Sequence, residues 1–264
     1  MLKTLYIRFC CSSIPHSMQN LALFISGGGS TATAIIHACK PGGILHKKVK
    51  PVLVVASTPK AAGIGRVTGT MTLDSKDIIV ISPNDYRNAD LTRNADRFGE
   101  ALMNACEKRN VTLFGQYGWL AKTPANFLRV FPNGINQHPA PLCPGEMDFG
   151  GKGMYGRRCH LAVLLFRRLT ERDFWTTATA QQVSAGYDEG AILRQERVDI
   201  FPDDDVEALQ ARVLPAEHRV QINTLLDSAD GIARPFHNDP LVLPHEEEHW
   251  VLSRKMAILA YPKG

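Results

Sequence analysis

The chain has 264 residues, 44% of them hydrophobic and 21% charged, and a formal net charge of +4. This composition is enough for a buried core in one large or two small domains. The longest apolar run, Leu161 to Phe166, is far shorter than the roughly 20 residues that span a bilayer, and no arginine-rich or aromatic-interleaved stretch indicates nucleic-acid binding. We therefore expect a soluble protein with neither a membrane nor a nucleic acid as partner.

Residues 1–20 are interpreted as an N-terminal extension. They carry Lys3, Arg8 and several serines but no acidic residue, which faintly resembles a transit sequence, although translation starting at Met18 fits equally well. A secretory signal is not expected, because Arg8 interrupts the apolar stretch and no small-residue cleavage pattern follows.

Positive charge is concentrated early in the chain. Residues 1–73 contain eight Lys or Arg and no Asp or Glu, whereas the remainder holds 22 basic and 26 acidic residues. A basic first third can attract an anionic ligand. The alternative is that these lysines and arginines are solvated and bind no ligand.

Six cysteines have neither the CxxC spacing of metal sites nor the density of a disulfide scaffold. They are Cys10, Cys11, Cys39, Cys106, Cys143 and Cys159. Reduced thiols and a cytoplasmic location are expected, and a metal site is not.

The segment from Leu21 to Cys39 is typical of a strand, a glycine loop and a helix. The apolar run Leu21 to Ser26 is followed at once by Gly27, Gly28 and Gly29. Glycines let backbone N–H groups approach an anion, and the start of the next helix adds partial positive charge, so a phosphate is the expected ligand. The loop matches neither GxGxxG nor the Walker pattern, and a plain turn remains an equal alternative.

Strands and helices alternate through the middle of the chain. Strands are expected at 52–57, 78–81, 111–114 and 135–138, an amphipathic helix at 90–109, and a second helix before Pro132 with Thr123 as its N-cap and Pro124 in its first turn. This alternation predicts an α/β, Rossmann-like three-layer fold with a mostly parallel central sheet.

The stretch GINQHPAPL, Gly134 to Leu142, is the strongest candidate site. Asn136 and His138 share one face of an extended backbone, and the following prolines prevent a helix. Ligands of open α/β sheets bind beyond the carboxyl ends of strands, so an amide and an imidazole at a strand end suit an active site. A polar cap on a strand is the alternative.

A glycine-rich loop, 139–158, follows this stretch and is expected to contact substrate because long loops without secondary structure are usually functional or disordered. A helix at 161–169 and strands at 176–183 and 191–200 come next. The sequence GYDEG at 186–190 suits the hairpin turn between these strands as well as it suits catalysis.

The last predicted core element is a helix that begins near Asp203 and carries Glu217. Pro215 is expected to kink it and to move Glu217 off a simple helical register. The residues after Asp230 are interpreted as a solvated C-terminal tail, since HEEEH at 245–249 lacks the HExxH spacing of a zinc site.

These motifs together resemble those of folate-dependent formyltransferases, over about Leu21 to Leu226 and most closely at Gly134 to Pro144 and Ala185 to His218. The resemblance implies a formyltransferase catalytic domain at 21–230 and catalytic roles for Asn136, His138 and Asp188. It assigns the substrate phosphate to Gly27, Gly28, Gly29, Ser30 and Thr31, the substrate amine to Glu217, and the folate to Tyr117, Trp119 and Leu120.

The resemblance also implies a reaction. A formyl group passes from 10-formyltetrahydrofolate to the amine of a phosphorylated small molecule, glycinamide ribonucleotide, in purine biosynthesis by a monomer or homodimer. Formyl transfer proceeds through a tetrahedral intermediate with an oxyanion and an ammonium. An asparagine amide stabilises the oxyanion, a histidine moves protons near neutral pH, a neighbouring carboxylate favours the imidazolium, and no metal is required.

The chain departs from the family at the loop after His138, which is longer and of different sequence, and Gln181 replaces a family histidine. Three basic residues lie in or beside this loop: Lys152, Arg157 and Arg158. One interpretation is that they bind the phosphate or the folate tail, and the alternative is that they are solvated. The acceptor therefore has alternatives: an amino-sugar nucleotide, methionyl-tRNA, or water in a hydrolase. A non-catalytic phosphate-ligand or folate-binding module is the alternative outside enzymes.

Overall fold

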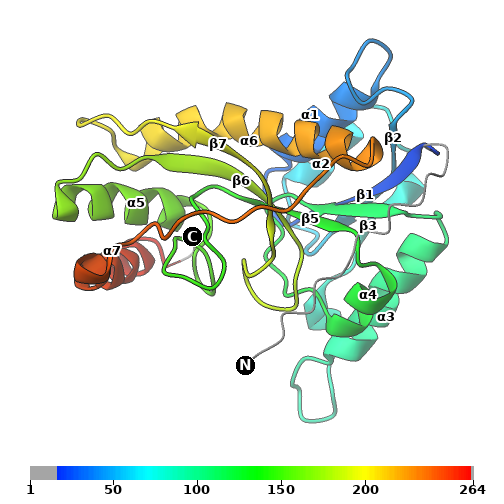
Figure 1. Ribbon diagram of the computed structural model, residues 1–264. Coiled ribbons are helices and arrows are strands. Elements are labelled where there is room, and N and C mark those ends of the chain that lie inside the picture. Colours follow the sequence, from blue (N-terminus) through cyan, green and yellow to red (C-terminus); the bar gives the residue numbers. More distant parts are fainter. Residues whose placement is uncertain (1–16, 263–264) are drawn as a thin grey trace, which may run out of the picture.

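A seven-stranded sheet forms the centre of the molecule, and its strand order is β3-β2-β1-β4-β5-β6-β7 (Figure 1). The structure is a computed structural model that describes residues 17–262, so the predictions for residues 1–16 lie outside it. The strands are β1 (Gln19–Ile25), β2 (Val49–Ala56), β3 (Ile78–Val80), β4 (Leu113–Gln116), β5 (Gly134–His138), β6 (Thr176–Gln182) and β7 (Ile192–Val198). The first five strands pair in parallel, whereas β6 and β7 join antiparallel, which confirms the mostly parallel sheet.

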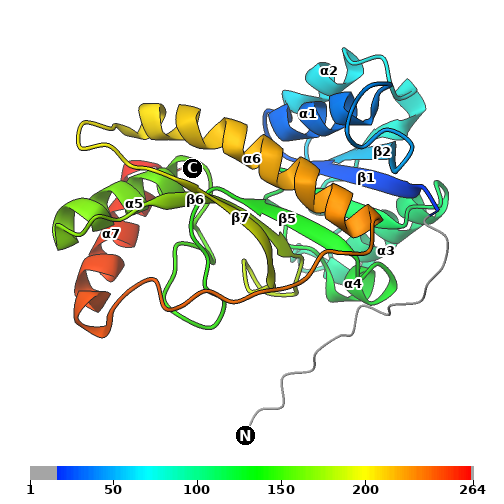
Figure 2. The same ribbon diagram turned by 45° about the horizontal axis from the view of Figure 1, so that its top comes forward.

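Helices cover both faces of the sheet (Figure 2). They are α1 (Ser30–Cys39), α2 (Gly63–Thr68), α3 (Ala95–Glu107), α4 (Ala125–Val130), α5 (Arg157–Thr170), α6 (Val206–Ala229) and α7 (Glu247–Ala260). None of the helices within 17–262 is both long and apolar enough to cross a membrane.

The strand β1 shows how the two cores form. Leu21, Leu23 and Ile25 point to one face and pack in a cluster with residues of α1, α5 and α6, whereas Ala22 and Phe24 pack on the other face with α3 and α4. Alternation along a strand sends successive side chains to opposite faces. The apolar part of β1, Leu21 to Ile25, is therefore buried on both sides.

Helix α6 corrects two predictions. Its N-cap is Asp205, whose Oδ1 accepts a hydrogen bond from Ala208 N at 2.7 Å, not Asp203. The helix also continues through Pro215 to Ala229, so Glu217 stays within one continuous helix. A proline removes a single helical hydrogen bond, and tertiary packing, which supplies most of the stability of a protein helix, holds both halves here.

The C-terminal segment also differs from the predicted solvated tail. Residues 247–260 form α7, which lies beside α5 (Figures 1 and 2). Ser253 and Ala257 are fully buried. Glu246 of the HEEEH stretch is also buried, and its carboxylate lies 3.3 Å from Arg172. The spacing of Trp250, Ser253 and Ala257 at three and four residues was the available signal for a packed helix.

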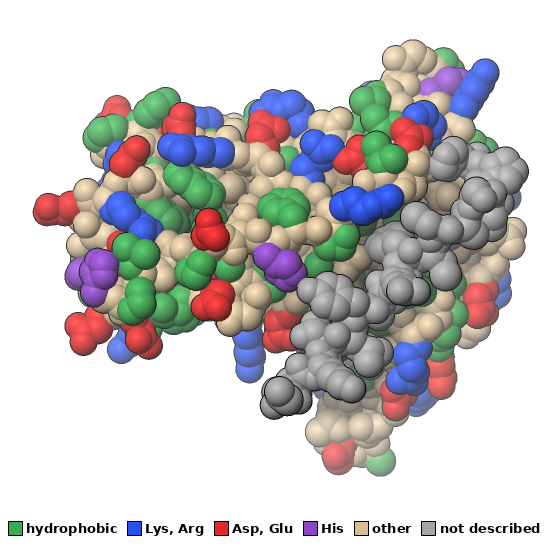
Figure 3. Space-filling view, viewed as in Figure 1, with side chains coloured by type: hydrophobic (Ala, Val, Ile, Leu, Met, Phe, Trp, Pro, Cys, Tyr) green, Lys and Arg blue, Asp and Glu red, His purple; other side chains and the backbone are tan. Residues whose placement is uncertain are grey.

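Charges are mixed on the face shown in Figure 3, where Lys and Arg side chains are interspersed with Asp and Glu. The basic first third is partly neutralised by later acids, since Lys48 forms an ion pair with Asp230 at 2.6 Å. Cys39, Cys106, Cys143 and Cys159, the cysteines within the described residues, are free thiols.

Candidate active site

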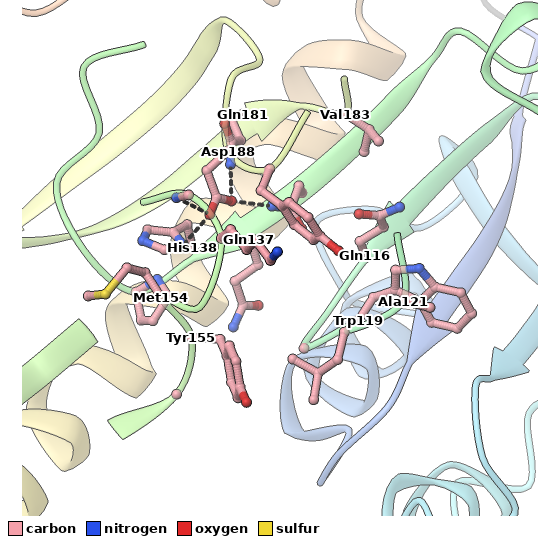
Figure 4. A pocket seen from close by; sticks show the side chains of 18 of the residues that line it. Gln116, Trp119, Ala121, Gln137, His138, Met154, Tyr155, Gln181, Val183 and Asp188 are labelled. Atoms are coloured by element: carbon pink, nitrogen blue, oxygen red, sulfur yellow. Dashed lines mark hydrogen bonds and ion pairs between the residues drawn. The ribbon is translucent and has the colours of Figure 1, made fainter. Parts of the chain in front are cut away.

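A cavity of about 570 Å³ lies at the carboxyl ends of β4 and β5 (Figure 4). The loops after β1, β4 and β5, the β6–β7 hairpin and α6 all contribute to its wall. The structure brings seven of the predicted site residues into this wall: Gly28, Trp119, Leu120, Asn136, His138, Asp188 and Glu217.

Asp188 connects the predicted catalytic residues. Its Oδ1 accepts hydrogen bonds from Asn136 Nδ2 at 3.1 Å and from Gln181 Nε2 at 2.7 Å, and its Oδ2 accepts one from Gly151 N at 3.0 Å. His138 Nδ1 lies 3.5 Å from the same Oδ2. Asp188 has a φ of 58°, a left-handed conformation that is uncommon outside glycine and that aims its carboxylate at β5.

His138 is almost fully buried, at 3% exposure. Its Nε2 donates to the carbonyl oxygen of Phe149 at 2.9 Å, so Nε2 carries a proton because a carbonyl only accepts. Burial by itself lowers the pKa of His138, but the Asp188 carboxylate, together with Cys159 and the Phe149 carbonyl, outweighs it and raises the pKa to about 10. At neutral pH the ring is therefore an imidazolium paired with Asp188.

Glu217 enters the cavity from α6. Its Oε1 accepts a hydrogen bond from Gln137 Nε2 at 2.5 Å, which links α6 to β5. Burial raises the pKa of Glu217 to about 7, against the opposing effects of the Gln137 hydrogen bond and the charge on His138. A carboxyl that titrates near neutral pH inside a cavity is a functional-site candidate.

The glycine loop reaches the cavity at one residue. Gly28 lines the wall, whereas Gly27, Gly29, Ser30 and Thr31 do not. Gly29 has φ +66°, and a Cβ there would lie 2.7 Å from the Cα of Gly63, so the turn needs glycine. Helix α1 starts at the next residue, which directs its free N–H groups toward this loop.

Two of the three predicted folate contacts line the cavity, and the third does not. Trp119 and Leu120 line the cavity, with Leu120 55% exposed. Tyr117 lies outside the cavity wall and is buried in the core. Its ring occupies the space beside Gly115, where an added Cβ would meet the Tyr117 hydroxyl at 2.1 Å.

Of the three basic residues in or beside the loop, only one lines the cavity. Lys152 lines the cavity. Arg158 is buried and donates to the main-chain carbonyls of Gly153, Tyr261 and Pro262, so it is structural and neither solvated nor free to bind an anion. Arg157 lies outside the cavity wall, 3.4 Å from Glu207.

The cavity residues that were not predicted include Gln137, Tyr155 and His160. Gln137 follows Asn136 directly, but strand alternation places it on the opposite face. His160 is 2% exposed and its Nδ1 has no hydrogen-bond partner. Burial, followed by the charge of His138, lowers its pKa to about 4, so it is neutral. A lone histidine within the run CHLAVLLF was its only sequence signal.

Comparison with known proteins identifies relatives. Residues 19–225 match the Formyl transferase family. The chain is 30% identical over 217 residues to a chloroplastic phosphoribosylglycinamide formyltransferase of Arabidopsis thaliana, covering 81% of this chain and 66% of that protein. It is 31% identical over 211 residues to the same enzyme of Vigna unguiculata, covering 78% of this chain and 60% of that protein. The chain thus matches slightly under two thirds of the length of these relatives.

Among solved structures, the glycinamide ribonucleotide transformylase 1 of Symbiobacterium toebii superposes with a TM-score of 0.64. The sequence identity is 26%, and the match covers 83% of this chain and 90% of that one. Both the α/β architecture and the mostly parallel sheet are therefore shared with a solved transformylase.

Proposed function

The chain belongs to the formyl transferase family, and from this premise we propose that it transfers the formyl group of 10-formyltetrahydrofolate to the primary amine of glycinamide ribonucleotide in purine biosynthesis. The observation that carries the proposal is the contact of Asn136 and His138 with Asp188 in the wall of one cavity. Formyl transfer needs an oxyanion donor, a positive charge and a proton acceptor at one carbon atom, and these three side chains supply them.

The reaction balances with these groups. The neutral amine attacks the formyl carbon, a C–N bond forms, and the carbonyl electron pair moves to oxygen. Asn136 Nδ2 and the charge of the His138 imidazolium stabilise that oxyanion. The new ammonium gives a proton to Asp188, the electron pair on oxygen re-forms the carbonyl, and the bond to N10 breaks as N10 takes up the proton that Asp188 received. The products are a formamide and tetrahydrofolate.

Glu217 binds the acceptor amine in this proposal. It stands in the same cavity wall as Asn136 and His138, and its ionisation near pH 7 gives it a negative charge where the amine approaches. The phosphate of the acceptor extends to Gly28 and the start of α1, where backbone N–H groups favour anions. The apolar wall at Trp119 and Leu120 suits the flat pterin ring of the folate.

The test is formyl transfer measured with the purified protein, 10-formyltetrahydrofolate and glycinamide ribonucleotide, beside His138→Ala. Wild-type turnover that falls at least about 100-fold in His138→Ala supports the proposal. Equal turnover in both proteins would refute the role of His138, and no turnover in either would remove this acceptor. Formate released at the same rate without any amine would indicate a hydrolase.

A further inference from the structure

Helix α7 contacts the loop that precedes α5. Trp250 Nε1 donates to the carbonyl oxygen of Asp148 at 2.6 Å. Arg254 Nη1 donates to the same oxygen and to the carbonyl oxygen of Gly150, both at 2.8 Å. The two α7 side chains are one helical turn apart and therefore face the same way. All three hydrogen bonds end on main-chain atoms, so they fix the path of the loop backbone.

The same loop residues hold the His138 and Asp188 side chains. Phe149 O accepts from His138 Nε2 at 2.9 Å, and Gly151 N donates to Asp188 Oδ2 at 3.0 Å. A Cβ added at Gly150 would lie 2.8 Å from the Cβ of Asp188. The backbone of 149–151 therefore lies directly against both groups, and a shift of this backbone must alter their relative position.

A second connection fixes the far end of α7. Arg158, at the start of α5, donates from Nε to Tyr261 O at 2.7 Å and from Nη2 to Pro262 O at 2.8 Å. Its Nη1 donates to Gly153 O at 2.8 Å. Arg158 is only 6% exposed, so a buried cation joins the end of α7 to the loop three residues beyond Gly150.

We propose that α7 positions the active site, with Trp250 and Arg254 holding the main chain of 148–151 so that Phe149 and Gly151 fix His138 and Asp188. This inference rests on the proposed function in so far as His138 and Asp188 are the reacting pair. Helix α7 lies outside residues 19–225, which match the family, so the proposed contacts come from a part of this chain that the match does not cover.

A positioning role differs from general stabilisation in what it changes. A displacement of about 1 Å at a catalytic group lowers turnover about 100-fold without changing ground-state binding to the same extent. Loss of the Phe149 carbonyl contact also removes one of the interactions that raise the pKa of His138. The pKa of His138 should therefore fall when α7 releases the loop, with or without substrate.

The experiment compares Arg254→Gln with Lys255→Gln. Lys255 is the next residue of α7, is exposed, and its substitution removes the same charge. For each folded variant, kcat and KM are measured and the His138 ring is titrated by NMR on histidine-labelled protein, its signal assigned with His138→Gln. In Arg254→Gln we expect kcat to fall about 10- to 100-fold with a small change in acceptor KM, and the His138 pKa to decrease. Arg254→Lys, which keeps the charge and donors, should recover part of both.

If Arg254→Gln and Lys255→Gln have the same kcat and the same His138 pKa, the proposal is overturned. If Arg254→Gln fails to fold, Trp250→Phe replaces it, because that change removes the Nε1 donor and keeps an aromatic side chain at this position. The same two readouts must move in the same direction, and unchanged values refute the role of α7. If wild-type protein does not formylate glycinamide ribonucleotide, the proposed function fails, but the His138 titration still decides the positioning role by itself.

Discussion

Glu217 of α6 and Gln137 of β5 form a hydrogen bond of 2.5 Å between Oε1 and Nε2 inside the cavity wall. The pair joins the helix and strand that carry the proposed amine site and the Asn136–His138 pair. Because Glu217 is buried at 6% exposure and its pKa is raised from 4.5 to about 7, the charge of this pair depends on pH in the neutral range.

Glu217 should make the folded state less stable as pH rises from 4.5 to about 7. Between pH 4.5 and about 7 the folded protein keeps a proton that the unfolded chain has released, so the free energy of unfolding falls with pH, by on the order of 3 kcal/mol over the full interval. Glu217→Gln removes this term. Urea unfolding across that interval should show a flatter pH dependence for the variant than for wild type.

The matched control for this measurement is Glu248→Gln on α7, an exposed carboxylate whose loss should leave the pH dependence as in wild type. A Glu217→Gln protein with the same slope as wild type would contradict the raised pKa of Glu217.

Asp188→Asn should abolish the charge that keeps His138 protonated. Burial of His138 lowers its pKa, and Asp188 is the largest interaction that raises it. Without that carboxylate, His138 should lose its proton below neutral pH, and kcat at neutral pH should fall by about 100-fold or more. NMR titration of the histidine ring and steady-state kinetics measure the two effects. Asp173→Asn, at a side chain 85% exposed, is the control, and a His138 that stays charged at neutral pH in Asp188→Asn would contradict the ion pair.

The sequence was sufficient for the site where local rules decide the geometry. Strand alternation brings Asn136 and His138 to one face, and the glycine loop between β1 and α1 follows from an apolar run that ends in three glycines. The hydrogen bond between Asn136 and Asp188 joins positions 52 residues apart. No local rule predicts such a contact, and it was expected only from the family resemblance.

Three features of the structure were not predicted from the sequence, and each has a specific physical cause. Gln137 was missed because alternation sends it away from Asn136, and only the packing of α6 over that face brings Glu217 to meet it. Tyr117 was expected at the folate, but Gly115 has no side chain and the ring fills the space beside it. The role of Trp250 depends on a partner 102 residues earlier, which sequence periodicity cannot reveal.

Gly29→Ala should weaken acceptor binding through the glycine loop. The φ of +66° is strained for alanine, and its Cβ would lie 2.7 Å from the Cα of Gly63. We therefore expect the free energy of unfolding to fall by about 1–3 kcal/mol. The KM for the phosphorylated acceptor should rise more than the KM for the folate does. Gly65→Ala, with nothing within 4 Å of the added Cβ, is the control. An unchanged acceptor KM in a destabilised Gly29→Ala protein would separate the loop from phosphate binding.

Gln137→Leu should move the pH dependence of acceptor use upward. The hydrogen bond from Gln137 lowers the pKa of Glu217, while burial raises it to about 7. Leucine of similar size keeps the burial and removes the bond, so the Glu217 pKa should rise above that of wild type and the ionised form should appear only at higher pH. If ionised Glu217 binds the amine, kcat/KM for the acceptor rises through the Glu217 pKa, and this rise shifts to higher pH in Gln137→Leu. Gln137→Glu would place a second carboxyl against Glu217 and should shift the rise in the same direction. A midpoint that stays at its wild-type pH in both variants would show that Glu217 does not control acceptor binding.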